Sequence, residues 1–138
     1  MRAALLTVSV CLVVLLNTGC AGTMLPGRMY TTPAGRVLQF SIQTSYGNGK
    51  MEAYDPGTGE RFTGEYSGFY RGQDAVYGTV GGEGVALVKP PTGANAFGIL
   101  VGDKATTIRL YFEIKPGLRP TGYGIGADQN GNRYEVFF

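Results

Sequence analysis

Residues 37–43 read VLQFSIQ, and this stretch sets a pattern that much of the later chain repeats. Leu38, Phe40 and Ile42 are apolar, whereas the residues between them are polar. A period of two places the apolar side chains on one face of a half-buried β-strand. The stretch therefore predicts a sheet with one face in a core and the other in water.

Similar short runs follow, separated by turn sequences such as DPGTG (55–59) and DQNGN (128–132). The predicted strands after 37–43 are Lys50–Tyr54, Phe62–Tyr66, Asp74–Val80, Ala96–Val101, Thr106–Ile114, Gly122–Ala127 and Arg133–Phe138. Short strands at such regular spacing are typical of small barrels and sandwiches. We predict an all-β fold, a small antiparallel meander that closes into an eight-stranded barrel, with a β-sandwich as the alternative.

Closure of such a barrel requires the last strand to pair with the first. We therefore predict that residues 133–138 pair with residues 37–43, with Tyr134 and Val136 facing the core. The glycine-rich and proline-rich residues 81–94 are predicted to be a connection outside the sheet. Glycines inside the strands, such as Gly64 and Gly124, are expected at sharp bends and bulges.

The first residues have the features of an export signal. Arg2 precedes an apolar run that ends near Leu16, which is too short for a membrane span of roughly 20 residues. The sequence LLNTGC (15–20) then places Gly19 directly before Cys20, one of two cysteines in the chain. An ordinary secretory signal cut near Gly22 is the alternative to a lipoprotein signal.

The stretch LLNTGC resembles the lipobox of bacterial lipoproteins, with Asn17 in place of the usual leucine three residues before the cysteine. The resemblance implies a signal peptide at 1–19, removed with Cys11, and a diacylglyceryl and palmitate modification on Cys20. We expect a flexible tether over 20–34 and a single β domain over 35–138. Because Ala21 rather than Asp follows the cysteine, the resemblance implies sorting to the outer membrane, facing the periplasm.

The charged residues are few and scattered singly, with a formal net charge of +2. A nucleic-acid-binding domain would show a basic patch or stripe, so this partner class is not expected. The chain has no histidine, which excludes Ser-His-Asp and Cys-His catalysis and the usual zinc sites. Glu52, Glu60 and Glu65 are the nearest approach to a glycosidase carboxylate pair, but we expect them on solvated strand faces. We predict no enzyme activity, no cofactor and no metal.

Aromatic residues and arginines cluster in one third of the chain. Tyrosine and arginine are favoured at interfaces because one end packs and the other forms hydrogen bonds. The alternative is that these residues pack in and around the barrel core. The candidate interaction surface consists of Tyr54, Arg61, Tyr66, Tyr70 and Arg71.

Two longer stretches, DPGTGERFTGEY (55–66) and GYGIGADQNGNRYEVFF (122–138), resemble a group of small proteobacterial lipoproteins to which no activity is assigned. The resemblance implies no catalytic residue. We therefore expect a non-catalytic, membrane-anchored envelope lipoprotein that acts as a binding or structural module with an envelope protein partner. The alternative is a periplasmic inhibitor of a hydrolase such as lysozyme.

Overall fold

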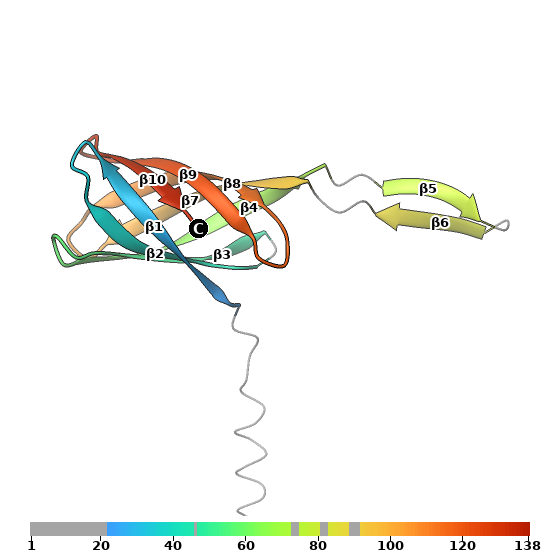
Figure 1. Cartoon of the computed structure of the whole chain (residues 1–138), viewed down its shortest axis with the longest axis horizontal. Helices are drawn as coiled ribbons and strands as arrows, with labels where there is room; N and C mark the ends of the chain where they lie inside the picture. The colour runs from blue at the N-terminus through green and yellow to red at the C-terminus, as the bar shows by residue number, and fades with distance from the viewer. Residues whose placement is uncertain (1–21, 46, 73–74, 81–82, 89–91) are drawn as a thin grey trace, which may run out of the picture.

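The structure is a computed structural model that describes residues 22–45, 47–72, 75–80, 83–88 and 92–138 (Figure 1). The described residues form strands and turns and contain no helix. The strands are β1 (Met24–Thr32), β2 (Val37–Gln43), β3 (Asn48–Asp55), β4 (Glu60–Arg71), β5 (Ala75–Val80), β6 (Glu83–Val88), β7 (Gly93–Gly102), β8 (Thr107–Lys115), β9 (Thr121–Asp128) and β10 (Arg133–Phe137).

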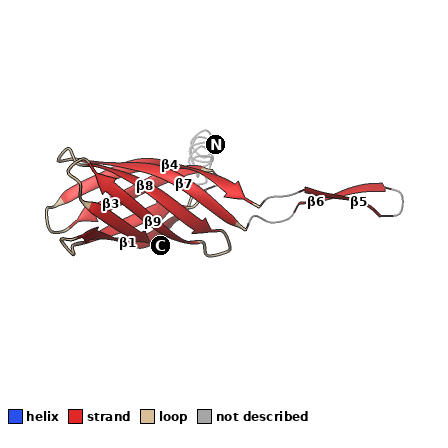
Figure 2. Cartoon of the chain, turned by 90° about the horizontal axis from the view of Figure 1, so that it is seen from above, coloured by secondary structure: helices blue, strands red, loops and turns tan. Residues whose placement is uncertain are grey.

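Eight of these strands form a closed barrel in the order β1-β10-β9-β8-β7-β4-β3-β2. Figure 2 shows this barrel from above, with the other two strands outside it. All the neighbouring strands in the barrel run antiparallel. The predicted fold class is confirmed: the chain is all-β, and it closes into an eight-stranded barrel rather than a sandwich.

The first barrel strand is β1, which corrects the prediction of a flexible tether over residues 20–34. Residues 24–30 pair with β2, and residues 28–32 pair with β10. The β domain therefore begins at Met24 and not at residue 35. Every strand of the barrel lies between Met24 and Phe137, so a chain that starts at Gly22 contains the complete hydrogen-bonded barrel.

Pro26, Gly27 and Thr31 hide the alternation of β1 in the sequence. The inward positions are held by Leu25, Gly27, Met29 and Thr31, so a glycine and a hydroxyl stand where apolar residues would mark a core face. Pro26 pairs with Ser41 of β2 and lies before the segment that pairs with β10. Proline is tolerated where only one side of a strand is paired, and for this reason it does not exclude the strand.

The barrel closes between β1 and β10, which corrects the predicted pairing of residues 133–138 with residues 37–43. β1 lies between these two strands and pairs with both. The predicted inward residues are confirmed, since Tyr134 and Val136 are both buried in the core. The alternation of apolar and polar residues was enough to predict which way these side chains point. The strand that pairs with β10 was not predicted, because β1 was not recognised in the sequence.

The predicted strand over 74–80 and the predicted connection over 81–94 also need correction. Residues 75–80 form β5, which pairs only with β6 (83–88) in a separate two-stranded sheet. This hairpin is an insertion between β4 and β7, which pair with each other up to Arg71 and Gly93. Figures 1 and 2 show the hairpin projecting from one end of the barrel. The barrel still has the predicted number of eight strands, because β1 is a barrel strand that was not predicted and β5 is a predicted strand that lies outside the barrel.

Inward-facing side chains fill most of the barrel, as expected for eight strands. Phe40 stacks on Phe112 with ring centroids 6.1 Å apart, and Phe138 contacts both rings. The apolar core cluster consists of Met29, Leu38, Phe40, Ile42, Met51, Ala53, Phe62, Tyr66, Ala96, Leu100, Ile108, Leu110, Phe112, Tyr134 and Val136.

Two inward glycines make room for their neighbours. A Cβ on Gly64 would lie 1.8 Å from the carbonyl oxygen of Ile99 on β7, and a Cβ on Gly124 would lie 2.4 Å from the Phe112 ring. Glycine within a strand often marks such a close approach. Glycine at position 64 therefore lets β4 and β7 approach closely, and glycine at position 124 leaves room for the Phe112 ring in the core.

The barrel position of β1 predicts different effects for two methionines of the same strand. Met29 is fully buried and Met24 is exposed. Met29→Asp places an unpaired charge in the core and should cost about 3 kcal/mol or more of unfolding free energy, whereas Met24→Asp should change it by about 0.5 kcal/mol at most. Urea unfolding followed by circular dichroism measures both. Equal midpoints for the two variants would show that residues 24–32 are a tether after all.

Candidate functional site: the two ends of the barrel

The two ends of the barrel differ in how the chain closes them. At one end lie the four short turns that follow β1, β3, β7 and β9. At the other end lie the start of β1, the hairpin insertion after β4, the turns that follow β2 and β8, and the C-terminus. We call the first end the polar end and the second the open end.

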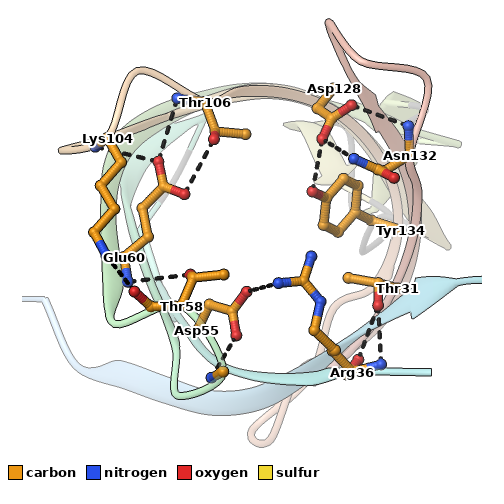
Figure 3. Close-up of polar contacts among 11 residues, drawn as sticks. Thr31, Arg36, Asp55, Thr58, Glu60, Lys104, Thr106, Asp128, Asn132 and Tyr134 are labelled. Carbon is orange, nitrogen blue, oxygen red and sulfur yellow. Dashed lines mark hydrogen bonds and ion pairs between the residues drawn. The ribbon is translucent and has the colours of Figure 1, made fainter. Parts of the chain in front are cut away.

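Buried carboxylates close the polar end (Figure 3). Asp55 forms an ion pair with Arg36 at 2.7 Å and accepts a hydrogen bond from the Gly57 amide at 2.8 Å. Glu60 accepts hydrogen bonds from the amides of Lys104 and Thr106 and from the Thr106 hydroxyl at 3.0–3.3 Å. Both acidic residues are buried. Buried charges of this kind are tolerated when they are paired and hydrogen-bonded.

Asp128 and Tyr134 extend the same arrangement to the opposite wall. The Tyr134 hydroxyl donates to Asp128 at 2.9 Å, and Asp128 also accepts from Asn132 and from the Asn130 amide. Partial burial raises the pKa of Asp128, but these hydrogen bonds outweigh it and hold the pKa below its ordinary value. Burial and the neighbouring Asp128 carboxylate raise the pKa of Tyr134.

The carboxylates considered for glycosidase chemistry do not share a cleft. Glu60 points into the barrel, whereas Glu52 and Glu65 lie on its exposed outer face. Glu52 pairs with Thr63, and Glu65 pairs with Lys50 across the β3–β4 ladder. Within the described residues no group of three or more acidic, histidine or cysteine side chains is placed to hold a metal ion. The carboxylates at the polar end accept hydrogen bonds from amides of the turns and thereby hold these turns in place.

An apolar cavity of about 570 Å³ occupies the open end. Ile42, Tyr66 and Ala94, all buried, are among its inner lining residues. Leu25, Ile114 and Phe138 are partly buried and continue from this lining to the core cluster. The Tyr66 hydroxyl donates to the Gln43 carbonyl oxygen at 2.7 Å, so its polar atom is engaged by the turn beside the cavity. A volume of this size lies within the range of small-molecule pockets.

The rim of the cavity is apolar and basic. Leu118, in the turn between β8 and β9, lines the cavity and is fully exposed to solvent, and Phe69 is 55% exposed. Lys115 and Arg119 are exposed and are neighbours in sequence of lining residues, although neither is itself part of the lining. Arg36–Asp55 is the ion pair found among the described residues, so Lys115 and Arg119 have no carboxylate partner among them.

The outer wall of β7, β8 and β9 is a second apolar surface. Phe97 contacts Phe69 and Tyr111, with centroid separations of 6.3 and 5.0 Å. Ile99 and Ile125 are about half exposed on the same wall. The outward positions of β2 and β3 are by contrast mostly polar. Contiguous apolar surface of this kind often marks an interaction site.

The structure does not bring the five predicted interaction residues into one surface. Tyr54 and Arg61 face each other across β3 and β4 on the outer wall, with the guanidinium 4.9 Å from the ring centroid. Tyr66 is buried inside the barrel, which removes it from any outer surface. Tyr70 lines the cavity and Arg71 is exposed at the open end.

Several residues of the cavity were missed in the sequence. Leu25 was assigned to the tether, and Ile114 and Phe138 were expected to be ordinary strand residues. The signal that could have been used is Leu118, an apolar residue inside the turn KPGLRP (115–120). Cys20 and the predicted signal peptide lie outside the described residues.

Comparisons with protein-family models, with curated proteins and with solved structures found no match for this chain. Within the described part of the chain, no helix is long and apolar enough to cross a membrane.

The lowered pKa of Asp128 predicts a pH dependence of stability. Its contribution is present above the unfolded pKa of about 3.9 and is lost as the pH falls through the lower folded pKa. Asp128→Asn should therefore cost about 1 to 2 kcal/mol at pH 7, and its difference from the wild type should shrink below about pH 4. Urea unfolding at both pH values measures this difference.

Asp103→Asn is the matched control for this experiment. Asp103 is exposed at the same end and accepts one hydrogen bond, from the Arg61 amide at 3.1 Å. Its substitution should change stability by about 0.5 kcal/mol at most at either pH. A wild-type advantage over Asp128→Asn that persists unchanged at low pH would contradict the role assigned to the Asp128 carboxylate.

Proposed function

We propose that the chain is a non-catalytic envelope lipoprotein, anchored at Cys20, whose barrel is held with its open end toward the membrane. The observation that carries this proposal is the position of β1, which begins at the open end. Cys20 precedes Met24 by four residues, and so few residues span about 14 Å at most. A lipid on Cys20 would therefore keep the cavity rim close to the bilayer surface.

The chemistry of the open end supports this orientation. The exposed side chains of Leu118 and Phe69 suit an apolar boundary, and the exposed cations Lys115 and Arg119 suit anionic head groups. The polar end, with its buried carboxylates, would face the aqueous compartment. We place the protein at the outer membrane facing the periplasm because Ala21 follows the lipidated cysteine.

The absence of catalysis is inferred from how the buried carboxylates are used. Asp55 and Glu60 accept hydrogen bonds from Gly57 and Thr106 of the turns, and Glu52 and Glu65 are exposed on the outer wall. A catalytic pair needs two carboxylates that face a common cleft. This arrangement favours a binding or structural module.

Substitution of Cys20 tests the anchor. In cells fed a labelled fatty acid, Cys20→Ala should abolish lipid labelling and cause an uncut precursor to accumulate. Cys11→Ala is the matched control, since Cys11 lies within the proposed signal peptide, and it should change neither result. Mass spectrometry of the mature protein measures the processing. A Cys20→Ala protein that is processed to the wild-type mass without lipid would overturn the lipoprotein assignment in favour of an ordinary secretory signal.

A periplasmic inhibitor of a hydrolase such as lysozyme remains the second candidate, and the projecting hairpin favours it. β5 and β6 pair only with each other, so each presents an unpaired edge. A free edge or a protruding loop is a common means of docking to a partner protein. Such a hairpin at the open end could enter the cleft of a hydrolase.

Replacement of the hairpin tests this second function. β4 and β7 are adjacent antiparallel strands, so a two-residue Asn-Gly turn in place of residues 72–92 should leave the barrel intact. The wild-type protein should inhibit a lysozyme in a cell-wall clearance assay, and the shortened variant should lose the inhibition. Equal inhibition by both proteins, or none by the wild type against a panel of lysozymes, would exclude the hairpin as an inhibitory element.

A further inference from the structure

We infer that the cavity at the open end, which we call the cup, binds a long-chain fatty acid, with the acyl chain inside the cup and the carboxylate at its basic rim. This inference extends the proposed function and depends on it only for the source of the ligand, because the anchor would hold the cup beside a bilayer. Four features of the described residues carry it: the apolar lining of the cavity, its closed inner end, the cations near its rim and the position of the start of β1.

The lining of the cup suits a flexible hydrocarbon chain. Leu25, Ile42, Ile114 and Phe138 supply aliphatic and aromatic surface, and Ala94 leaves space between them. Burial of each methylene contributes about 0.8 kcal/mol, so a long chain gains more than a short one. Gln43, Thr44 and Ser45, which are polar residues of the lining, lie at the end of β2 and in the turn that follows it.

The cup is blind, and this limits the shape of its ligand. Beyond the lining, the rings of Phe40 and Phe112 and the Met51 side chain are fully packed in the barrel core. A ligand can therefore enter from the open end only, and its polar group must remain there. A single-chain amphiphile meets both conditions, with one apolar tail and one polar end.

The cations near the rim select the charge of the ligand's head group. Lys115 and Arg119 flank the lining residues of the turn after β8, and Arg71 follows the lining residue Tyr70. None of these three cations forms an ion pair with a carboxylate among the described residues. Glu113, the nearest carboxylate in sequence to this turn, is exposed on β8 and forms no such pair either. The surplus of positive charge favours an anionic head group.

The position of the segment that leads into β1 favours a ligand taken from a membrane. Gly22 lies against the turn after β2, and the Thr44 amide donates to the Thr23 carbonyl oxygen at 2.9 Å. Leu25, three residues after Gly22, already lines the cup. The segment that leads to the proposed anchor thus leaves beside the mouth, where fatty acids partition into the bilayer.

Displacement of a dansyl-labelled undecanoate measures the binding directly. The protein used is the chain from Gly22 onward, which contains the complete barrel, so that the result does not depend on lipidation. We expect saturable binding of one equivalent, displaced by palmitate. Hexadecanol and hexadecylamine should displace it more weakly, because they lack the anionic head group, and octanoate should displace it more weakly because its chain is short.

Two substitutions in the cup should block binding. Ala94→Phe fills the inner lining, and Ala127→Phe is the matched control because Ala127 is exposed on the outer wall of β9. Leu118→Ser removes a lining side chain that is fully exposed, so it keeps the test valid even if Ala94→Phe does not fold. We expect Ala94→Phe to abolish binding, Leu118→Ser to weaken it, and Ala127→Phe to leave it unchanged.

Charge variants separate the head-group contact from the acyl-chain contact. Lys115→Gln with Arg119→Gln should weaken palmitate binding roughly threefold to tenfold, in line with exposed ion pairs. Arg109→Gln with Arg133→Gln removes the same net charge on β8 and β10 near the polar end and should have no effect. The hexadecanol competition should not change in either double variant.

Three results would overturn the inference. The first is the absence of saturable binding by the chain without substitutions. The second is binding as tight as that of the wild type by both Ala94→Phe and Leu118→Ser. The third is a lipidated protein from membranes that excludes palmitate although the unlipidated chain binds it, because the cup would then hold the protein's own acyl chain. Each of these results leaves the Cys20 labelling experiment unaffected, so failure of the ligand and failure of the anchor can be distinguished.

Discussion

The pairing of β1 with β10 is the interaction on which the rest of the structure depends. It joins the first and last strands of the barrel, Arg28–Thr32 with Arg133–Phe137, and leaves the barrel without an open edge. Without it β1 and β10 would each present unpaired amides and carbonyls, and the inward side chains of Met29 and Val136 would lose a neighbouring wall. Closure also fixes the width of the interior, which side chains such as Phe112 then fill.

Closure also explains why the two ends of the barrel differ. Antiparallel strands return at alternate ends, so the start of β1 and the end of β10 must lie at the same end. That end also carries the hairpin insertion, so fewer short turns cover it. The other end has only short turns, and there Asp55, Glu60 and Asp128 hold the loops by hydrogen bonds. The cavity lies at the end where β1 starts and β10 ends, where fewer short turns join neighbouring strands.

The sequence predicts the class of fold and the orientation of strand residues well, because both follow from a period of two. Phe40, Tyr134 and Val136 face the core as their alternation indicates. The sequence also contains the similar stretches GERF (59–62) and GNRY (131–134), which follow two turns that begin with aspartate. In both turns the aspartate accepts a hydrogen bond from the amide two residues later, at 2.8 Å. Local chemistry of this kind is encoded within a few residues and can be predicted from them.

The candidate site was harder to predict because it is made by segments far apart in the sequence and by what they leave unfilled. Tyr66 and Tyr70 stand close together in the chain and both line the cavity, yet Tyr66 is buried in the core and Tyr70 is only partly buried. Leu25, Ile114 and Phe138 meet only because β1, β8 and β10 reach the same end of a closed barrel. Composition identifies residues that favour interfaces, but it does not state which of them remain uncovered. The cavity forms only when the barrel closes, and the barrel closes through β1. β1 was not predicted because Gly27 and Thr31 occupy inward positions where apolar residues would have marked a strand.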